Sequence, residues 1–274
     1  MKRILVPTDF SEHAEDALKV AAQIAKKNDS EIIILHTLEL PHQTSDAILG
    51  GASIPEAIFF MKKANETLDE ISAKPYLDGI KITEIAKMDK PSHGIIQISK
   101  EYDVNLIIMG SHGSSAIDQL HIGSNTEKVL RNSEIPVLVI KNSTTNFTAS
   151  EIVFASDFTN ETKKPFAKLL EFTKFFDSKI NLVTICTPNS FKPTHVIEKA
   201  MISFVSEFNL TNYSTHIYND TNIEKGIINF SNSVNADIIG MCTHGRTGFA
   251  HFFNGSISEG LVNHAVKPVI TFKI

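Results

Sequence analysis

The chain of 274 residues carries one pattern twice, and this internal repeat constrains its fold more than any single motif does. Residues 4–11 return 148 positions later as residues 152–159, with the same Asp-Phe pair near the end of each run. Gly94-Ile95-Ile96 returns 132 positions later as Gly226-Ile227-Ile228, so the second copy is 16 residues shorter. Matches that keep their order over most of a chain indicate a duplicated structural unit.

The length suits two compact domains, since a domain has roughly 100 to 200 residues. We expect a first domain at 1–141, a linker at 142–150 and a second domain at 151–274, because residues 141–146 form a polar run between two apolar segments. The additional residues of the first copy fall between 38 and 93. The polar, Gly-containing stretch at 41–53 is predicted to be a loop.

Composition excludes several classes of partner. The net charge is −5 and the isoelectric point about 6.1, so no basic field is available for nucleic-acid phosphates. The chain has only two cysteines, which argues against a disulfide scaffold and suits a reducing compartment. No apolar run approaches the 18 residues of a membrane span, and Asp9 interrupts any signal-like segment. We expect a cytoplasmic protein that contacts neither nucleic acid nor membrane.

Short β-branched runs alternate with helical patterns, which is typical of an α/β fold built around a parallel sheet. In the first half, strands are predicted near 2–8, 31–38, 80–88, 105–110 and 136–140, and helices near 12–27, 55–75, 93–102 and 124–132. The strands are continuously apolar, as expected when helices cover both faces of a sheet. The fold class is therefore α/β, with two tandem doubly wound domains whose ligands bind at the carboxyl ends of the strands.

A Gly-rich segment follows the fourth predicted strand of each half. In the first half Met109-Gly110-Ser111-His112-Gly113 is followed, after nine residues, by Gly123-Ser124-Asn125-Thr126. The second half has Met241-Cys242-Thr243-His244-Gly245 and, after nine residues, Gly255-Ser256-Ile257-Ser258. Glycines between a strand and a helix let backbone amides and the helix N-terminus meet phosphate groups. The segments predict a nucleotide site that is complete in the first half only.

In these features the chain resembles the universal stress protein family in its tandem, two-domain form. The resemblance rests on Pro7-Thr8-Asp9-Phe10-Ser11 after the first strand, on Leu35-His36-Thr37 at the end of the second, and on Gly-x2-Gly-x9-Gly-Ser. It implies a Rossmann-like sheet in the order 3-2-1-4-5 in each half. It also implies that Asp9 and Thr37 meet the adenosine of ATP, or of AMP or ADP, and that the glycine loop meets ribose and phosphates, with Mg²⁺ held through the nucleotide.

Carried onto this sequence, the implied nucleotide-binding residues are Pro7, Thr8, Asp9, Thr37, Met109, Gly110, Ser111, Gly113, Gly123, Ser124, Asn125 and Thr126. Other interpretations of some residues stay open. Asp9 is also well placed to cap the helix that follows it. His112 and His244 recur at equivalent positions, where they can hydrogen-bond the backbone as readily as move protons, and no catalytic role is assigned to them. His36 is expected to have a structural role.

The second half departs from the ATP pattern. Cys242 replaces the first glycine, where its side chain is expected to obstruct a ligand, and Ile185 replaces Thr37. A weak or altered second site is predicted from the residues that persist, which are Asp157, Gly245, Gly255, Ser256 and Ser258. Cys186, Cys242 and His244 lack the paired spacing of zinc sites, so no protein-bound metal is predicted.

The leading functional hypothesis is an ATP-binding stress-response protein whose nucleotide state alters contacts with an unknown protein partner. The sequence contains no Gly-Lys dipeptide and no His-Glu-x-x-His or Gly-x-Ser-x-Gly element, so committed catalysis is not predicted. A slow ATPase or nucleotide-transfer enzyme and a nucleotide-free interaction scaffold stay as alternatives. The last strand of each half is apolar, so the two are expected to pair in an internal pseudo-dimer. Further pairing of whole chains is left open.

Overall fold

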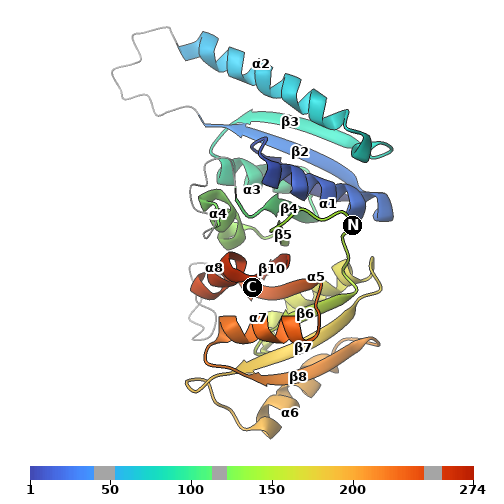
Figure 1. The fold of residues 1–274 in the computed structure, drawn as a ribbon, viewed down its shortest axis with the longest axis vertical. Coiled ribbons are helices and arrows are strands. Elements are labelled where there is room, and N and C mark those ends of the chain that lie inside the picture. The colour runs from blue at the N-terminus through green and yellow to red at the C-terminus, as the bar shows by residue number, and fades with distance from the viewer. Residues whose placement is uncertain (40–52, 113–121, 244–254) are drawn as a thin grey trace.

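The computed structural model describes residues 1–39, 53–112, 122–243 and 255–274, and in it both copies of the repeat are α/β units that share one sheet (Figure 1). The first half contains β1 (Arg3–Thr8), α1 (Glu12–Asn28), β2 (Glu31–Leu38), α2 (Ser53–Ser72), β3 (Ile82–Met88), α3 (Pro91–Glu101), β4 (Leu106–Gly110), α4 (Ser124–Asn132) and β5 (Val137–Ile140). The second half contains β6 (Glu151–Ala155), α5 (Lys163–Thr173), β7 (Lys179–Cys186), α6 (Thr194–Val205), β8 (Tyr213–Asn219), α7 (Ile223–Ser233), β9 (Ile238–Thr243), α8 (Gly255–His264) and β10 (Val269–Lys273).

Ten strands form a single sheet in the order β3-β2-β1-β4-β5-β10-β9-β6-β7-β8. Each half therefore has the predicted order 3-2-1-4-5. Neighbouring strands are parallel except at the centre, where β10 runs antiparallel to β5 with Ile270 opposite Leu138. The pairing of the last strands is thus confirmed, and it covers one edge of each half, which leaves β3 and β8 as the edge strands of the sheet. Figure 1 shows the consequence, with β5 and β10 at the middle of the molecule and α2 and α6 at its two ends.

The core has two layers, one on each face of the sheet. One layer contains Ile4, Leu138 and Ile270 from the strands and is covered by α1, α2, α5 and α6. The other contains Leu5 and Val269, which point to the opposite face, and is covered by α3, α4, α7 and α8. In the inner strands alternate residues are buried on opposite faces, which explains why these strands read as continuous apolar runs.

The repeated Asp-Ser pair after the first helix of each half has a structural cause. Asp29 and Asp177 have left-handed backbones with φ of 50° and 51°, a conformation that aspartate tolerates well. The next residue, Ser30, donates a hydrogen bond to the Met1 carbonyl at 3.0 Å, and Ser178 donates one to the Ala149 carbonyl. In both halves the pair therefore ties the chain to the start of the first strand, and in the first half Asp29 is also the C-cap of α1.

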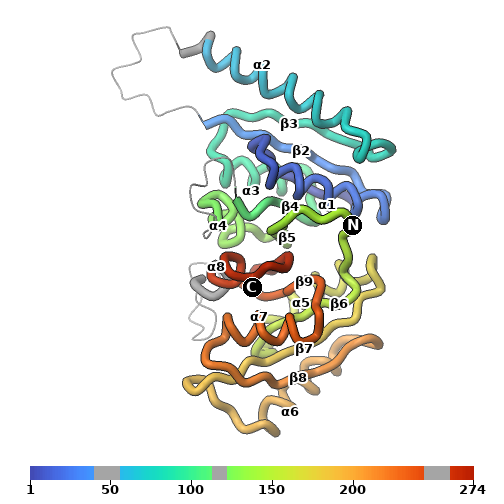
Figure 2. The backbone as a smooth tube through the Cα atoms, viewed as in Figure 1, coloured from blue at the N-terminus to red at the C-terminus, as the bar shows by residue number. Residues whose placement is uncertain are grey.

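The halves differ most around their second helices. α2 has 20 residues and α6 has 12, so part of the length difference lies in the helix itself. The loop predicted at 41–53 lies outside the described residues except for Ser53, which begins α2. Residues 141–150 lead from β5 to β6, a path that can be followed in Figure 2. Among the described helices, none has the length and apolar character needed to cross a membrane.

Candidate functional site

A tight turn after β1 places Asp9 at the carboxyl edge of the sheet. Phe10 has a left-handed backbone with φ of 67°, and its N–H donates to Thr8 Oγ1 at 3.0 Å. Asp9 Oδ1 accepts a hydrogen bond from the N–H of Ser11 at 3.1 Å, and Ser11 is itself the N-cap of α1. Asp9 therefore helps to start α1, in keeping with the capping interpretation, while it remains at the strand end where a ligand would lie.

His36 holds the same turn from the neighbouring strand. Its Nδ1 donates to the Thr8 carbonyl at 2.8 Å, and its ring stacks on Phe10 with the centroids 4.2 Å apart. In the second half Thr184 Oγ1 donates to the Ser156 carbonyl at 3.0 Å, so a different side chain makes the equivalent bond. The contacts of His36 are thus those of a residue that supports the turn.

Thr37 packs closely against helix α3 because α3 has a glycine, Gly94, at the contact. A Cβ added to Gly94 would lie 2.8 Å from Thr37 Cγ2, closer than side chains approach one another. In the second half a Cβ on Gly226 would lie 2.5 Å from Ile185 Cγ2. The glycine at this position of the repeat therefore lets the helix approach the end of the second strand. The sequence shows that this glycine recurs in both halves, but it does not show that the glycine contacts Thr37 in one half and Ile185 in the other.

Gly110 ends β4 and packs against the first turn of α1. A Cβ at this position would lie 2.7 Å from the backbone oxygen of His13, whereas the sequence attributed this glycine to close approach by a ligand. In the second half Cys242 stands at the equivalent position, and the chain opposite it forms a 3-10 helix, η3 (Asn160–Thr162), before α5 begins. Cys242 is buried in the core and is not among the described residues that line the pocket of the second half, so its expected effect on a ligand stays a prediction.

The N-terminus of α4 faces the same edge. Gly123 is its N-cap and has no side chain with which to cap the helix, while its N–H donates to the Ser111 carbonyl at 2.8 Å. Thr126 Oγ1 donates to the Gly110 carbonyl at 3.1 Å and holds the helix to the end of β4. Ser124 and Asn125 make no side-chain hydrogen bond to another described residue. The first amides of a helix carry partial positive charge, so this end favours an anion.

These elements enclose one pocket at the carboxyl ends of β1, β2 and β4. The sequence-predicted residues that line it are Pro7, Thr8, Asp9, Thr37, Met109, Gly110, Gly123, Ser124, Asn125 and Thr126. The sequence missed Ala14, Leu35, Pro91, Ile95 and His112, which also line it. Of these, Pro91 and Ile95 come from the first turns of α3, the helix that Gly94 allows to approach. The repeated Gly-Ile-Ile motif was the signal that could have found them.

Two predicted residues are not in this lining. Ser111 is fully buried outside the lining, and its hydroxyl lies 2.8 Å from Nδ1 of His112. Ser111 therefore holds the ring of His112, which does line the pocket. Gly113 lies outside the described residues. The site is therefore built from the ends of three strands and the starts of α1, α3 and α4, with His112 held beside the end of β4.

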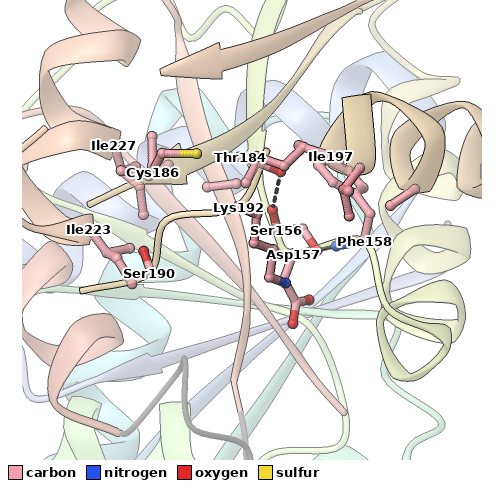
Figure 3. A pocket seen from close by; sticks show the side chains of 14 residues that line it. Ser156, Asp157, Phe158, Thr184, Cys186, Ser190, Lys192, Ile197, Ile223 and Ile227 are labelled. Carbon is pink, nitrogen blue, oxygen red and sulfur yellow. Dashed lines mark hydrogen bonds between the residues drawn. The ribbon is translucent and has the colours of Figure 1, made fainter. Parts of the chain in front are cut away.

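The second half has a pocket at the corresponding edge, but its walls are more apolar (Figure 3). Ile185 stands where the first half has Thr37, and Ile223 stands where it has Pro91. Figure 3 shows Ile223 and Ile227 on one side of the pocket and Ile197 and Phe158 on the other. Its hydroxyl groups are largely engaged within the protein, which leaves aliphatic surface facing the cavity.

One polar contact of that pocket repeats the bond between Phe10 and Thr8 in the first half, and another is its own. Ser156 Oγ accepts a hydrogen bond from the N–H of Phe158 at 3.0 Å, and Ser190 Oγ lies 2.8 Å from Thr187 Oγ1. Asp157 lines the pocket as predicted for a second site, together with Lys192. Of the other residues predicted there, Gly255, Ser256 and Ser258 lie in the first turns of α8, and Gly245 is outside the described residues.

Both cysteines are buried thiols. Burial raises the pKa of Cys186, against a smaller lowering by Lys192. Burial and then the carboxylate of Asp157 raise the pKa of Cys242 far above its usual range. Among the described residues, no group of three or more His, Cys, Asp or Glu side chains is placed to hold a metal ion. The thiols are neutral packing groups at neutral pH.

The sequence and the fold of this chain were compared with those of known proteins. The family model described as the universal stress protein family matches residues 1–141 and 211–273. The chain belongs to the universal stress protein family. The unmatched stretch between these segments contains β6, α5, β7 and α6, which include Ile185 and the altered start of α5.

Individual relatives agree with this assignment. A universal stress protein of Methanocaldococcus jannaschii is 31% identical over 153 residues, which cover 51% of this chain and 94% of that protein. One from Bacillus subtilis is 29% identical over 145 residues, covering 51% of this chain and 98% of that protein. The crystal structure of a universal stress protein from Archaeoglobus fulgidus has a TM-score of 0.77 and covers 99% of this chain and 98% of that one. At 24% identity that likeness is one of fold.

Proposed function

We propose that this universal stress protein binds an adenine nucleotide, ATP or its products ADP and AMP, in the pocket of its first half. The observation that carries the proposal is the N-terminus of α4, where Ser124 and Asn125 lie in one pocket with Asp9 and Thr37. A polyanion is favoured at a helix end that no side chain caps. Polar groups at the ends of β1 and β2 are then available to the uncharged part of the ligand.

Within the proposed site, the residues divide by chemistry. Asp9 and Thr37 offer an acceptor and a hydroxyl to the adenosine. The segment from Met109 and Gly110 through Gly113 to Gly123, and the first residues of α4, offer amides and hydroxyls to ribose and phosphates. The hydroxyl of Thr126 already donates to Gly110, so it contributes as an acceptor or through its N–H. Mg²⁺ enters bound to the phosphates.

In this proposal the domain spanning 1–141 carries the site, residues 142–150 are the linker, and the domain spanning 151–274 has a weak or altered site. The apolar walls of the second pocket support the asymmetry, because Ile185 offers no hydrogen bond where Thr37 does. Regulation through nucleotide-dependent contacts with a protein partner is the role that we infer for such a chain. Fast turnover is not part of the proposal.

Thermal unfolding with and without Mg-ATP tests it. A ligand that binds only the folded state adds about 2.7 kcal/mol of stability at 100 times its Kd, and this raises Tm by roughly 5 to 10 °C for a chain of this size. GTP should give a smaller shift, since Asp9 and Thr37 are proposed to read the adenosine. An equal shift with GTP contradicts that assignment, and steady hydrolysis faster than about 1 s⁻¹ contradicts a binding role.

A pair of exchanged residues sharpens the test. Thr37→Ile gives the first pocket the residue of the second, and we expect it to remove most of the shift with Mg-ATP. Ile185→Thr is the matched control, because the reverse change in the second half should leave the shift unaltered. The proposal is wrong if Thr37→Ile keeps the full shift and Ile185→Thr alone changes it.

A further inference from the structure

A cavity lies between the two halves, at the opposite ends of the strands from the proposed nucleotide pocket. It opens at the starts of β4 and β5, where Leu106 and Ile135 form one wall. Phe172 and Phe175, at the end of α5, form the other wall, and Glu171 lies at its rim. The lining is mainly aromatic and aliphatic, with the polar side chains of Asn105, Lys168 and Glu171 beside it. Lys168 Nζ donates to the Glu134 carbonyl at 2.7 Å, and the Glu171 carboxylate can accept a hydrogen bond, so the cavity suits an apolar group that also carries a donor.

The internal repeat identifies the counterpart of this cavity in the rest of the molecule. Met1 lines the cavity, and its counterpart is Ala149, since the two carbonyls accept the equivalent bonds from Ser30 and Ser178. Asn105 Oδ1 accepts the N–H groups of residues 2 and 3, as Asp237 Oδ2 accepts those of residues 150 and 151. The correspondence therefore holds atom by atom around the starts of β1 and β6.

At the site equivalent to this cavity, next to the start of β6, a phenylalanine of the linker is buried. Phe147 is only 8% exposed, and its N–H donates to Gln23 Oε1 at 2.7 Å. Gln23 of α1 is the counterpart of Glu171 of α5, because the two differ by the offset of 148. The next residue, Thr148, donates from its hydroxyl to Asp237 Oδ1 at 2.8 Å. Phe147 and Thr148 are thus held by Gln23 and Asp237, the counterparts of Glu171 and Asn105 in the cavity lining, and the ring centroids of Phe147 and Phe176 lie 5.9 Å apart.

By this correspondence, we propose that the cavity is a docking site for an aromatic side chain carried on an extended segment of a partner protein. Phe172 and Phe175 receive the ring, and the Glu171 carboxylate accepts the N–H of the same residue, as Gln23 does for Phe147. In the second half, residues 147–149 pass over the equivalent surface into β6, so the fold itself shows how such a segment enters. The site uses the strand ends opposite the nucleotide pocket and is independent of the proposed function.

The linker provides its own probe. An acetylated and amidated peptide of residues 142–151, Asn-Ser-Thr-Thr-Asn-Phe-Thr-Ala-Ser-Glu, is added to the full chain, and methyl NMR signals are followed. We expect saturable binding that shifts signals of Leu106, Ile135 and Ile270, which line the cavity. The same peptide with Phe147→Ala should bind about tenfold more weakly or worse, because the buried ring supplies most of the apolar contact.

Protein variants locate the peptide. Glu171→Ala, at an exposed residue on α5, should weaken binding several-fold, and Glu171→Gln should restore it because an amide oxygen accepts the same N–H. Phe175→Ala should weaken binding further. Gln23→Ala is the matched control at the linker's own seat and should have no effect. The proposal is overturned if the peptide shows no saturable binding at millimolar concentration, if neither Glu171 nor Phe175 matters, or if only Gln23→Ala abolishes binding.

Discussion

Replacing Gly110 with alanine tests the contact between β4 and α1. The new Cβ would lie 2.7 Å from His13 O and 2.9 Å from His13 C, so a backbone segment has to move rather than a flexible side chain. Overpacking of this kind costs about 1 to 3 kcal/mol, and a collision with backbone belongs at the upper end. At about 3 kcal/mol the Tm should fall by roughly 6 to 12 °C for a protein of this size.

Gly240→Ala is the matched control for that change. Gly240 lies in β9, the counterpart of β4, and its added Cβ would meet its nearest neighbour, Phe154, at 3.4 Å, an ordinary contact. Its Tm should stay within a few degrees of the unchanged protein. Scanning calorimetry on both variants gives the answer, and nucleotide binding should weaken only in Gly110→Ala because the first turn of α1 borders the pocket. Equal Tm values for the two variants would refute the reasoning.

Three further changes probe other contacts. His36→Leu removes the donor to the Thr8 carbonyl and should cost about 1 to 3 kcal/mol in urea unfolding; an unchanged midpoint contradicts the role. The hydrogen bond from Thr83 lowers the pKa of Glu31 below its ordinary value of 4.5. The ionised Glu31 carboxylate therefore stabilises the folded protein fully above pH 4.5, and this stabilisation is lost as the pH falls through the lowered pKa. The Tm difference between the unchanged protein and Glu31→Gln should therefore shrink in acid; a constant difference argues against it. Cys242, buried with a raised pKa, should resist thiol reagents until the chain unfolds, and rapid labelling of the folded protein would contradict its burial.

Most of the architecture could be predicted because local sequence patterns and the internal repeat determine it. Continuous apolar runs and helix-period segments were enough for the strand and helix positions of the first half, and the long-range repeat indicated a second unit of the same kind. The pairing of β5 with β10 followed from the cost of leaving two apolar edges uncovered. The edge at which Asp9, Thr37 and the start of α4 meet followed from right-handed crossovers in a parallel sheet.

Contacts between distant segments could not be predicted, since they depend on how closely elements approach in space. Gly110 looked like a ligand-facing glycine, but its missing Cβ faces His13. Cys242 replaces a glycine of the repeat, and only the fold shows that its side chain is buried in the core. Phe147 sits in a stretch that reads as a polar linker, and only the fold shows that its ring is buried. Each of these is a single-residue packing relation with no periodic signal.

The central claim is that one adenine nucleotide binds in the first half, and titration calorimetry with Mg-ATP tests it most directly. The account predicts close to one tight site per chain. Gly113→Val should abolish that site, because a β-branched side chain in the predicted glycine loop would crowd the phosphates, whereas the matched Gly245→Val should leave it largely intact. Two equal sites in the unchanged protein, or loss of binding only in Gly245→Val, would contradict the account.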